Sequence, residues 1–562
     1  MALTVNTTTM MLYLFWIYLS VVSASSSTTS QRPPFLSHVS RETLLDTLQK
    51  AEGYHRKAVQ QALENYPVNA VTEEGDQELI QNVKLQEYTI DAPGALPDFQ
   101  KELPRAVLVT ETPLLTAEEC HQVIQSANEH FQQTTETGEW SQLPSGQYMV
   151  AGFWIKDIPS VQEWFLKTVK TRLFPLLARQ FPEFVQDPDN LCVDNAYLFK
   201  YTPETGGRTD VHTDSGCLSF TLALNPKSDY EGGGTWFDGL QKESSSSSSN
   251  DCVIEMDQGQ VTIRPGGVKH CGYAVESGER YIIGGFCMHQ KKPEIVRQIM
   301  AHSQQKPLEE IVDDISQLES AIVLNPKFDS AYNLLAVALE QQHKANHEAK
   351  RQEILEYCLQ NVNSYAGDVS YALGSLYRTA SPPNLSKAKE CFVKCLEADS
   401  HDVEAMIALM MVAADEQNTD EERTMAERIL QCSVANDKAK AQAYCNLGVL
   451  HEGQGDRELE YYQKAIKLQP HRFPPRYSLA CAYASNQQWA EATQHFREAL
   501  EHAKDTMTPE QRMQTLQNLY KTSMHVIQQQ VGNAKPSQAE IMELFRQVMG
   551  GEHFDALMKM RQ

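Results

Sequence analysis

The chain has 562 residues, too many for one hydrophobic core, and a domain size of ~100–200 residues predicts roughly three or four domains. Its composition, 41% hydrophobic and 22% charged, is ordinary for a soluble globular protein. The formal net charge of −24 gives a surface that repels nucleic acid and anionic membranes, so we expect neither as a partner. Such a surface would attract a basic polypeptide, but a solvated acidic surface needs no partner at all.

An apolar segment at the N-terminus indicates a targeting signal. Residues 10–22 (MMLYLFWIYLSVV) form an apolar run, and Val22 and Ala24 are spaced like a small-residue cleavage site. The run is shorter than the ~20 residues of a membrane-spanning helix. We therefore expect a signal peptide over residues 1–24, no membrane span after its cleavage, and a location in the endoplasmic reticulum lumen or outside the cell. Because no Lys or Arg precedes the run, a signal-anchored protein of the endoplasmic reticulum membrane is the alternative.

The 12 cysteines are too sparse for a disulfide scaffold, and no CxxC pair occurs. A luminal location is compatible with some disulfides, but the spacing of these cysteines does not pair them. The closest two, Cys391 and Cys395, fit the interior of a helix better than a metal site.

Residues 25–104 predict a linker followed by an N-terminal helical segment. A stretch with Ser, Thr and Pro extends to about residue 37, and leucines at helical spacing favour a helix over 40–64. Residues 65–100 are rich in Asp, Glu and Pro, which favours a loosely structured lead-in.

Residues 105–290 change to a pattern of two helices followed by short strands. A strand over 106–110 precedes a helix at 116–131 that opens with a capping box, and 158–183 is amphipathic. From residue 192 to 288 short apolar runs alternate with Gly, Pro and Asp, which suits a small β-sandwich or jelly roll. The tract Ser244–Ser249 predicts a loop between two strands.

Beyond residue 305 a helix-turn-helix repeat of about 34 residues replaces the strands. Small and large residues recur where paired helices would cross closely: Leu479, Ala480, Tyr483, Ala492, Phe496 and Ala499. Earlier units begin at Leu335-Ala336, Leu373-Gly374 and Leu447-Gly448. This region resembles tetratricopeptide repeats, which predicts an all-α solenoid over 305–503 and capping helices over 504–562.

Three residues of the strand-rich segment have the spacing of a metal site. His212 and Asp214 are two residues apart, so on a strand their side chains share one face, and His270 follows on a later strand. Two imidazoles and one carboxylate on one face of an octahedron leave three positions open. Iron(II) uses such positions for a bidentate oxoacid and for O2. We therefore predict iron(II) bound by His212, Asp214 and His270.

Sequence motifs around these ligands carry a family resemblance. The stretches YEGGGTWF, ESGERYIIGGF and VLVTETPLLTAEEC resemble the prolyl 4-hydroxylase and procollagen-lysyl hydroxylase branch of the iron(II)- and 2-oxoglutarate-dependent dioxygenases. The resemblance covers residues 105–290. It implies a double-stranded β-helix (jelly-roll) catalytic domain with flanking helices, 2-oxoglutarate as cosubstrate, O2, and support by L-ascorbate.

Three further residues are predicted to bind the cosubstrate. Arg280 follows His270 by ten residues beside the apolar run YIIGGF, where a buried guanidinium would hold the distal carboxylate of 2-oxoglutarate. Tyr201 lies where the family often has a tyrosine that reaches the cosubstrate, although core packing explains it equally well. Thr221, on the face shared by Ala223, is a possible hydrogen-bond partner of the oxoacid.

The sequence thus predicts a multidomain dioxygenase that hydroxylates prolyl or lysyl residues of a secretory-pathway polypeptide. The solenoid would bind the substrate or a partner protein, since its concave face suits an extended chain. Two alternatives stay open. One is a tetratricopeptide adaptor with a degenerate dioxygenase fold, and the other is a dioxygenase that acts on a small molecule.

Overall fold

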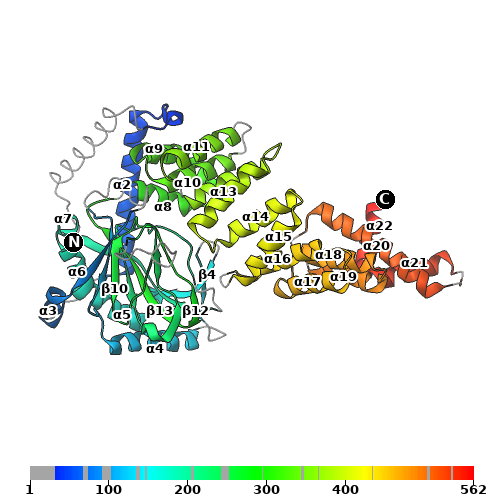
Figure 1. Ribbon diagram of the computed structural model, residues 1–562, viewed down its shortest axis with the longest axis horizontal. Coiled ribbons are helices and arrows are strands. Elements are labelled where there is room, and N and C mark those ends of the chain that lie inside the picture. The colour runs from blue at the N-terminus through cyan, green and yellow to red at the C-terminus, as the bar shows by residue number, and fades with distance from the viewer. Residues whose placement is uncertain are drawn as a thin grey trace. The chain divides into compact units, whose positions relative to one another are not determined.

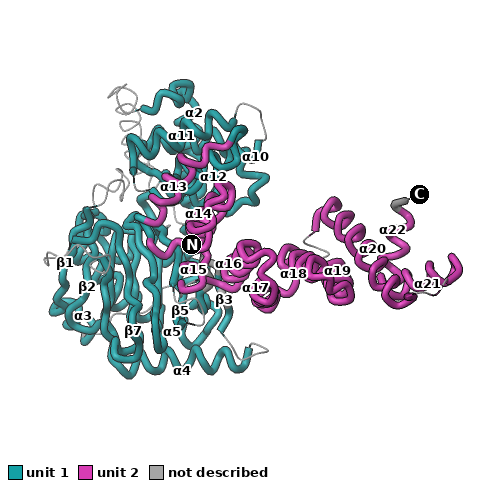
Figure 2. Tube along the Cα trace, turned by 45° about the vertical axis from the view of Figure 1, so that its right-hand side comes forward, with its two compact units in different colours: residues 1–382, 397–399 teal, residues 383–396, 400–562 magenta. Residues whose placement is uncertain are grey.

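The computed structural model describes residues 32–561, apart from gaps at 68–73, 92–102, 135–139, 146–147, 204–207, 215, 242–251, 294, 343–346, 365, 433–434, 503–506, 533 and 535. The expected signal peptide at 1–24 and the tract Ser244–Ser249 lie outside the described residues. Among the residues described, no helix is both long and apolar enough to cross a bilayer. Contacts divide the chain into two units, Met1–Pro382 with Glu397–Asp399 and Pro383–Leu396 with Ser400–Gln562 (Figure 2).

The first unit contains an eight-stranded antiparallel sheet (Figure 1) with the order β1-β2-β10-β6-β13-β5-β4-β3. The last strand in the sequence, β13, lies near the middle of the sheet, between β6 and β5. The bounds of the strands are β1 Leu85–Thr89, β2 Ala106–Thr110, β3 Gln142–Ser145, β4 Tyr148–Trp154, β5 Leu191–Tyr201, β6 Leu218–Ala223, β10 Val261–Pro265 and β13 Arg280–His289.

One face of this sheet packs against helices. Side chains alternate between the two faces of each strand, and on β6 the residues Leu218, Phe220 and Leu222 join the main apolar core. Phe165 and Leu173 belong to the same core on the helical side. The helices and the π-helical turn between them are α4 Ala117–Thr134, α5 Pro159–Thr168, η4 Val169–Leu173, α6 Phe174–Gln180 and α7 Pro182–Val185.

The other face of the large sheet lies against two small antiparallel sheets, one of order β11-β8-β9 and one that pairs β12 with β7. Val109, Phe237 and Ile254 pack together between the large and the three-stranded sheet. These sheets agree with the β-rich region expected from the sequence, whereas closure into a jelly roll stays a prediction. Their strands are β7 Tyr230–Gly232, β8 Thr235–Phe237, β9 Val253–Ile254, β11 His270–Gly272 and β12 Val275–Gly278.

The N-terminal helix packs onto the large sheet. Helix α2 (Arg41–Asn65) buries Ala62 against Cys192 and Met288. After the helix, the buried Tyr66 donates its hydroxyl to the carbonyl of Ala196 at 3.3 Å. The N-terminal helix is therefore a structural part of the first unit.

The lead-in expected at residues 65–100 is partly regular structure. Helix α3 (Glu74–Asn82) and strand β1 lie within it, and β1 pairs antiparallel with β2. The ion pair between Asp76 and Arg172 (2.7 Å from Oδ1 to Nε) fixes α3. The expectation of a loose segment was wrong for these residues because partners far along the chain supply their contacts.

The first helices after β13 belong to the sheet unit. We expected helical repeats from residue 305, separate from a catalytic domain at 105–290, but the helices up to Thr379 group with the sheet. Helix α2 packs against α8 and α9, and the rings of Tyr54 and His302 stack at 3.9 Å. The elements are α8 Ile295–Gln304, η8 Leu308–Asp314, α9 Ile315–Leu324, α10 Asp329–Gln341, α11 His347–Asn361 and α12 Gly367–Thr379.

The second unit is helical throughout its described elements, and each helix from α14 onward packs on the next. The small residues that defined the repeat lie at these crossings, since Ala480, Ala492 and Ala499 are fully buried. Its helices are α13 Leu385–Ala398, α14 Val403–Asp415, α15 Thr419–Gln431, α16 Asp437–Leu450, α17 Asp456–Leu468, α18 Phe473–Ser485, α19 Trp489–His502, α20 Pro509–Val531, α21 Gln538–Met549 and α22 Gly551–Arg561.

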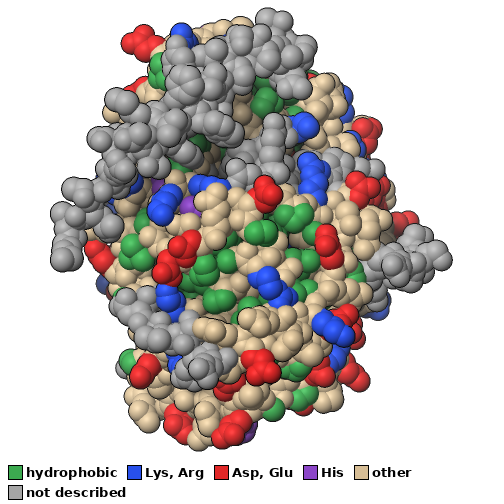
Figure 3. All heavy atoms as spheres, turned by 90° about the vertical axis from the view of Figure 1, so that its left-hand side faces the viewer, with side chains coloured by type: hydrophobic (Ala, Val, Ile, Leu, Met, Phe, Trp, Pro, Cys, Tyr) green, Lys and Arg blue, Asp and Glu red, His purple; other side chains and the backbone are tan. Residues whose placement is uncertain are grey.

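Acidic and basic side chains are scattered among apolar ones on the face drawn in Figure 3, rather than gathered into one patch of a single sign. On that face the net charge of −24 does not appear as a continuous acidic surface. A basic polypeptide would therefore find no single docking patch there.

Strand β13 contains two neighbouring glycines that differ in the space around them. Gly285 lies opposite Phe220 of β6, and a Cβ on Gly285 would lie 2.1 Å from Cζ of that buried ring. A Cβ on Gly284, which faces the opposite side, would lie 3.4 Å from Cε2 of Phe199. The tight approach of β13 to β6 therefore depends on Gly285.

We expect Gly285→Ala to destabilise the first unit by about 1–3 kcal/mol, because Phe220 has no space to move in the packed core. Gly284→Ala is the matched control on the same strand and should cost less than about 1 kcal/mol. Urea unfolding followed by tryptophan fluorescence measures both. Equal midpoints for the two variants would contradict the packing argument.

The unit boundary leads to a second expectation. A fragment of residues 32–399 should fold cooperatively, whereas 105–290 alone should aggregate, because it exposes the surfaces that α2 and α8 cover. Residues 400–562 should give a helical circular dichroism spectrum by themselves, since each repeat contacts only its neighbours. A stable, soluble fragment of 105–290 would show that the flanking helices are dispensable.

Candidate metal centre

The backbone brings His212 and His270 together. The two residues form an isolated antiparallel bridge, with N–H to carbonyl distances of 3.0 and 2.9 Å in the two directions. The amide of Asp214 donates to the carbonyl of Gly266 at 2.8 Å. We expected His212 and Asp214 to share one strand and His270 to follow on a later strand. His212 lies outside the named strands, and His270 of β11 is its direct pairing partner.

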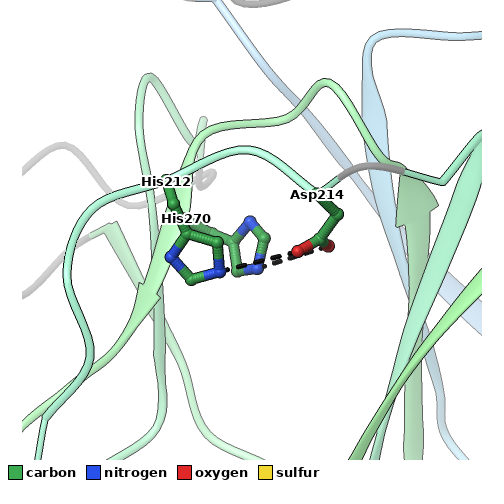
Figure 4. A group of neighbouring side chains, drawn as sticks. All are labelled: His212, Asp214 and His270. Carbon is green, nitrogen blue, oxygen red and sulfur yellow. Dashed lines mark ion pairs between the residues drawn. The ribbon is translucent and has the colours of Figure 1, made fainter. Parts of the chain in front are cut away.

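The three side chains point toward one another (Figure 4). Nε2 of His212 lies 3.5 Å from Oδ1 of Asp214, and Nε2 of His270 lies 3.5 Å from Oδ2 of the same carboxylate. One ligand atom of each residue lies within 4.8 Å of the others. The sequence predicted this group, and the structure brings all three members together.

Backbone carbonyls orient both imidazoles. Nδ1 of His212 lies 2.6 Å from the carbonyl oxygen of Asp210, and Nδ1 of His270 lies 2.9 Å from that of Val268. A carbonyl only accepts, so each Nδ1 carries the proton and each Nε2 presents a lone pair. This is the tautomer that a metal bound through Nε2 requires.

The charge states also suit a metal. Burial alone would raise the pKa of the Asp214 carboxyl, but His270, His212 and Arg264 beside it hold that pKa well below its usual range. Burial and the Arg264 guanidinium lower the pKa of His270 to about 3. At neutral pH the carboxylate is therefore ionised and His270 neutral, as metal ligands must be. The donor set fits a divalent transition metal such as iron(II).

Sequence analysis missed Arg264, which lies against the same group. It is 3% exposed, and its Nη2 lies 3.2 Å from Oδ2 of Asp214 and 2.7 Å from Nε2 of His270. Its Nη1 donates to Oγ1 of Thr221 at 3.1 Å. The signal in the sequence was a charged residue within the strand VTIRP, on the face opposite Val261 and Ile263.

The group borders a cavity of about 300 Å³ between the sheets. Its walls are mainly aromatic and aliphatic on one side and carry the polar groups of the metal centre on the other. The lining residues are Leu143, Val150, Trp154, Tyr197, Phe199, Tyr201, Thr209, His212, Thr221, Thr235, Arg264, His270, Gly272, Ile282, Gly284 and Phe286.

The predicted cosubstrate residues occupy different positions. Tyr201 and Thr221 line the cavity. Arg280 is 2% exposed but is not among the lining residues. Its Nη1 donates to the carbonyl of Gly234 at 2.8 Å, and its guanidinium lies 5.3 Å from the ring centre of Tyr201. The role of Arg280 toward an oxoacid stays a prediction, and in this geometry Tyr201 stands beside it.

Two contacts tie the first helices after the sheet to this centre. Arg297 of α8 donates to the backbone carbonyl of Asp214. Lys269, the residue before His270, pairs through Nζ with Oδ2 of Asp329 at the start of α10 at 2.7 Å. Burial opposes the charged form of Lys269, but the charge of Asp329 raises its pKa above the usual range. Both segments that carry the predicted metal ligands are therefore held by helices.

One protein-family model matches a short part of the chain. A tetratricopeptide repeat model matches residues 441–472, in the second unit. No curated protein sequence matches the chain.

Solved structures similar to this chain are of two kinds. YrrB, described as a TPR protein with an unusual peptide-binding site, has 19% identity, covers 34% of this chain and 93% of its own, and gives a TM-score of 0.28. An oxidoreductase of the 2OG-Fe(II) oxygenase family from Burkholderia pseudomallei has 11% identity and a TM-score of 0.25. The match covers 33% of this chain and 86% of that protein. The non-heme alpha ketoglutarate dependent carbocyclase SnoK from nogalamycin biosynthesis has 14% identity and a TM-score of 0.24. The match covers 39% of this chain and 87% of that protein.

Loss of either imidazole should abolish stoichiometric metal binding. His212→Ala and His270→Ala each leave two ligands, while the apolar core that holds the sheets is unchanged. Calorimetric titration with Mn(II) measures the binding, and circular dichroism checks the fold. His121→Ala, an exposed histidine on α4, is the control and should bind like wild type. Undiminished binding in both ligand variants would contradict the assignment.

Proposed function

We propose that the first unit is an iron(II)- and 2-oxoglutarate-dependent dioxygenase that hydroxylates prolyl residues of a polypeptide. The observation that carries the proposal is the group of His212, Asp214 and His270, with both Nε2 atoms directed at one ionised carboxylate beside a cavity. Bound iron(II) and 2-oxoglutarate would supply the oxidising chemistry, in which O2 and the oxoacid convert C–H to C–OH and release succinate and CO2. L-ascorbate would support turnover, as the family resemblance implies.

The residues of the chain would bind and position the reactants. His212, His270 and Asp214 would hold the metal at the cavity wall, with the tautomers of both imidazoles set by backbone carbonyls. The hydroxyls of Thr221 and Thr235 would offer hydrogen bonds to the polar end of the oxoacid. The surrounding apolar walls exclude water, which strengthens these polar contacts.

The cavity favours a prolyl over a lysyl side chain. Tyr197 lies 4.2 Å from Trp154 and 5.4 Å from Phe199, measured between ring centres, so one wall is aromatic. No Asp or Glu is among the described lining residues, and Lys156 lies over the ring of Trp154. A lysyl ammonium would therefore enter without a carboxylate partner, at a cost that an uncharged ring avoids.

The second unit would bind the substrate polypeptide or a partner protein through its tetratricopeptide repeats, because stacked repeats present an extended surface. The secretory location is likewise a proposal and rests on residues 10–22. No disulfide joins any of the 12 cysteines, all of which are among the described residues. An oxidising lumen does not require them to pair, since most are buried.

A second candidate function is an adaptor whose dioxygenase fold has lost its chemistry. The observation that favours it is the Arg264 guanidinium, which already neutralises Asp214. In an adaptor this ion pair would be permanent, and the centre would never bind a metal.

Peptide hydroxylation tests the proposal. Wild type with iron(II), 2-oxoglutarate and ascorbate should add one oxygen to proline-containing peptides, and succinate should form in equal amount. Matched peptides with Lys in place of Pro should be poorer by about tenfold or more, since an unpaired buried ammonium costs at least ~1.4 kcal/mol. Mass spectrometry and a succinate assay measure both.

His270→Ala is the inactive control for that assay. Preference for the lysyl peptide would contradict the substrate assignment alone. Metal binding without any peptide turnover but with succinate release would favour a small-molecule substrate. Absence of metal binding and of turnover in wild type would favour the adaptor.

A further inference from the structure

Arg264 is the cation that faces the cavity. It lies on β10 directly opposite Ser219 of β6, and its side chain reaches diagonally to Thr221 on that strand. Among the described residues that line the cavity, Arg264 is the one Lys or Arg. Its Nη1 and Nη2 are both engaged, and the guanidinium carbon lies 5.6 Å from the ring centre of Phe237.

The position of this guanidinium conflicts with that of a bound metal. A metal lies ~2.0–2.2 Å from imidazole nitrogen and carboxylate oxygen. Nη2 of Arg264 lies 2.7 Å from Nε2 of His270 and 3.2 Å from Oδ2 of Asp214, on the side where those atoms would bind the metal. Two cations cannot share this space, so the metal and Nη2 exclude each other from these two ligands.

A guanidinium displaced from Asp214 needs another anion. Leaving it buried and unpaired would cost several kcal/mol. The carboxylate of an oxoacid that chelates the metal would lie next to the metal, within the same cavity, and a carboxylate matches the guanidinium fork. Arg280 is less suited to this role because it is not among the residues that line the cavity.

We propose that Arg264 is a transferable counter-ion, which pairs with Asp214 or, once the metal takes Asp214, with a carboxylate of the cosubstrate. This inference rests on the proposed function and adds a residue that positions the cosubstrate. The proposal implies that metal binding and oxoacid binding are thermodynamically coupled. The metal alone must break the Arg264–Asp214 pair, whereas with the oxoacid also bound its carboxylate becomes the new partner of Arg264. The two ligands should therefore bind cooperatively, and Arg264 should be the source of much of that coupling.

The experiment measures Mn(II) affinity by calorimetry with and without 2-oxoglutarate, in full-length wild type, Arg264→Met and Arg280→Met. In Arg264→Met we expect Mn(II) alone to bind about tenfold more tightly than in wild type, since no guanidinium competes. The gain in Mn(II) affinity on adding 2-oxoglutarate should fall by about tenfold or more in that variant. Arg280→Met is the matched control: its Mn(II) affinity without oxoacid should equal that of wild type.

Two further variants guard against misfolding. Arg264→Met leaves Asp214 buried without its partner, so it should melt at a lower temperature than wild type and regain stability with Mn(II). Arg264→Gln keeps a hydrogen-bond donor for Thr221 but loses the charge. If Arg264→Met does not fold, the same changes in Mn(II) affinity are expected and measured in Arg264→Gln. Arg264→Met combined with Asp214→Asn removes both charges and should melt close to wild type without binding Mn(II).

The outcomes separate the two proposals. If wild type binds Mn(II) and turns over, but its Mn(II) affinity and its coupling to 2-oxoglutarate are unchanged in Arg264→Met, the counter-ion is wrong and the proposed function stands. If Mn(II) binds to Arg264→Met but never to wild type, even with 2-oxoglutarate, the guanidinium is a permanent occupant and both proposals fail. If neither protein binds Mn(II), the metal centre itself is wrong.

Discussion

A buried carboxylate must be surrounded by positive charge or hydrogen-bond donors, and Asp214 imposes this requirement on the first unit. Asp214 is 4% exposed, and the imidazoles of His212 and His270 and the guanidinium of Arg264 surround its carboxylate oxygens. Its own carbonyl accepts from Arg297 and its amide donates to Gly266. Side chains and backbone from β10, β11 and α8 thus converge on one residue. Three of the residues that contact it, His212, His270 and Arg264, line the cavity.

The large sheet supplies the frame that makes this convergence possible. Alternation along β6 sends Phe220 into the helical core and Thr221 into the cavity, so a single strand serves both layers. The same alternation on β10 places Ile263 in the core and Arg264 against the metal centre. Helices pack against one face of the sheet, and the candidate metal centre lies on the other. The desolvation cost of burying the Arg264 guanidinium is offset by its ion pair with Asp214.

Sequence spacing predicted the features that depend on local order. The two-residue spacing of His212 and Asp214 set both side chains on one side, and the capping box at Thr116 is present, with Glu119 N–H donating to its hydroxyl at 3.2 Å. Small residues at helix crossings, such as Ala480, likewise follow from a local period. The tetratricopeptide match at 441–472 falls inside the range predicted for the repeats.

Features that depend on long-range pairing were not readable from the sequence. Arg264 reaches the predicted ligands because β10 pairs with β6 in one particular register. No residue close to Arg264 in the sequence predicts that register. The docking of Tyr66 on Ala196 spans 130 residues, so a helix that looked like a free leader is part of the core unit. For the same reason the sequence did not show that α8 to α12 group with the sheet, a grouping to which the long-range ion pair between Lys269 and Asp329 contributes.

The pair between Lys269 and Asp329 has a consequence for how this architecture can be recombined. Lys269, the residue before the predicted ligand His270, is anchored on a helix that the repeat pattern would assign to the solenoid. An exchange of the repeat array between related proteins, in evolution or by design, would preserve the centre only if the crossover fell after α12. The first helices after β13 would therefore have to be moved together with the sheet, whereas the helices beyond residue 400 belong to the other unit.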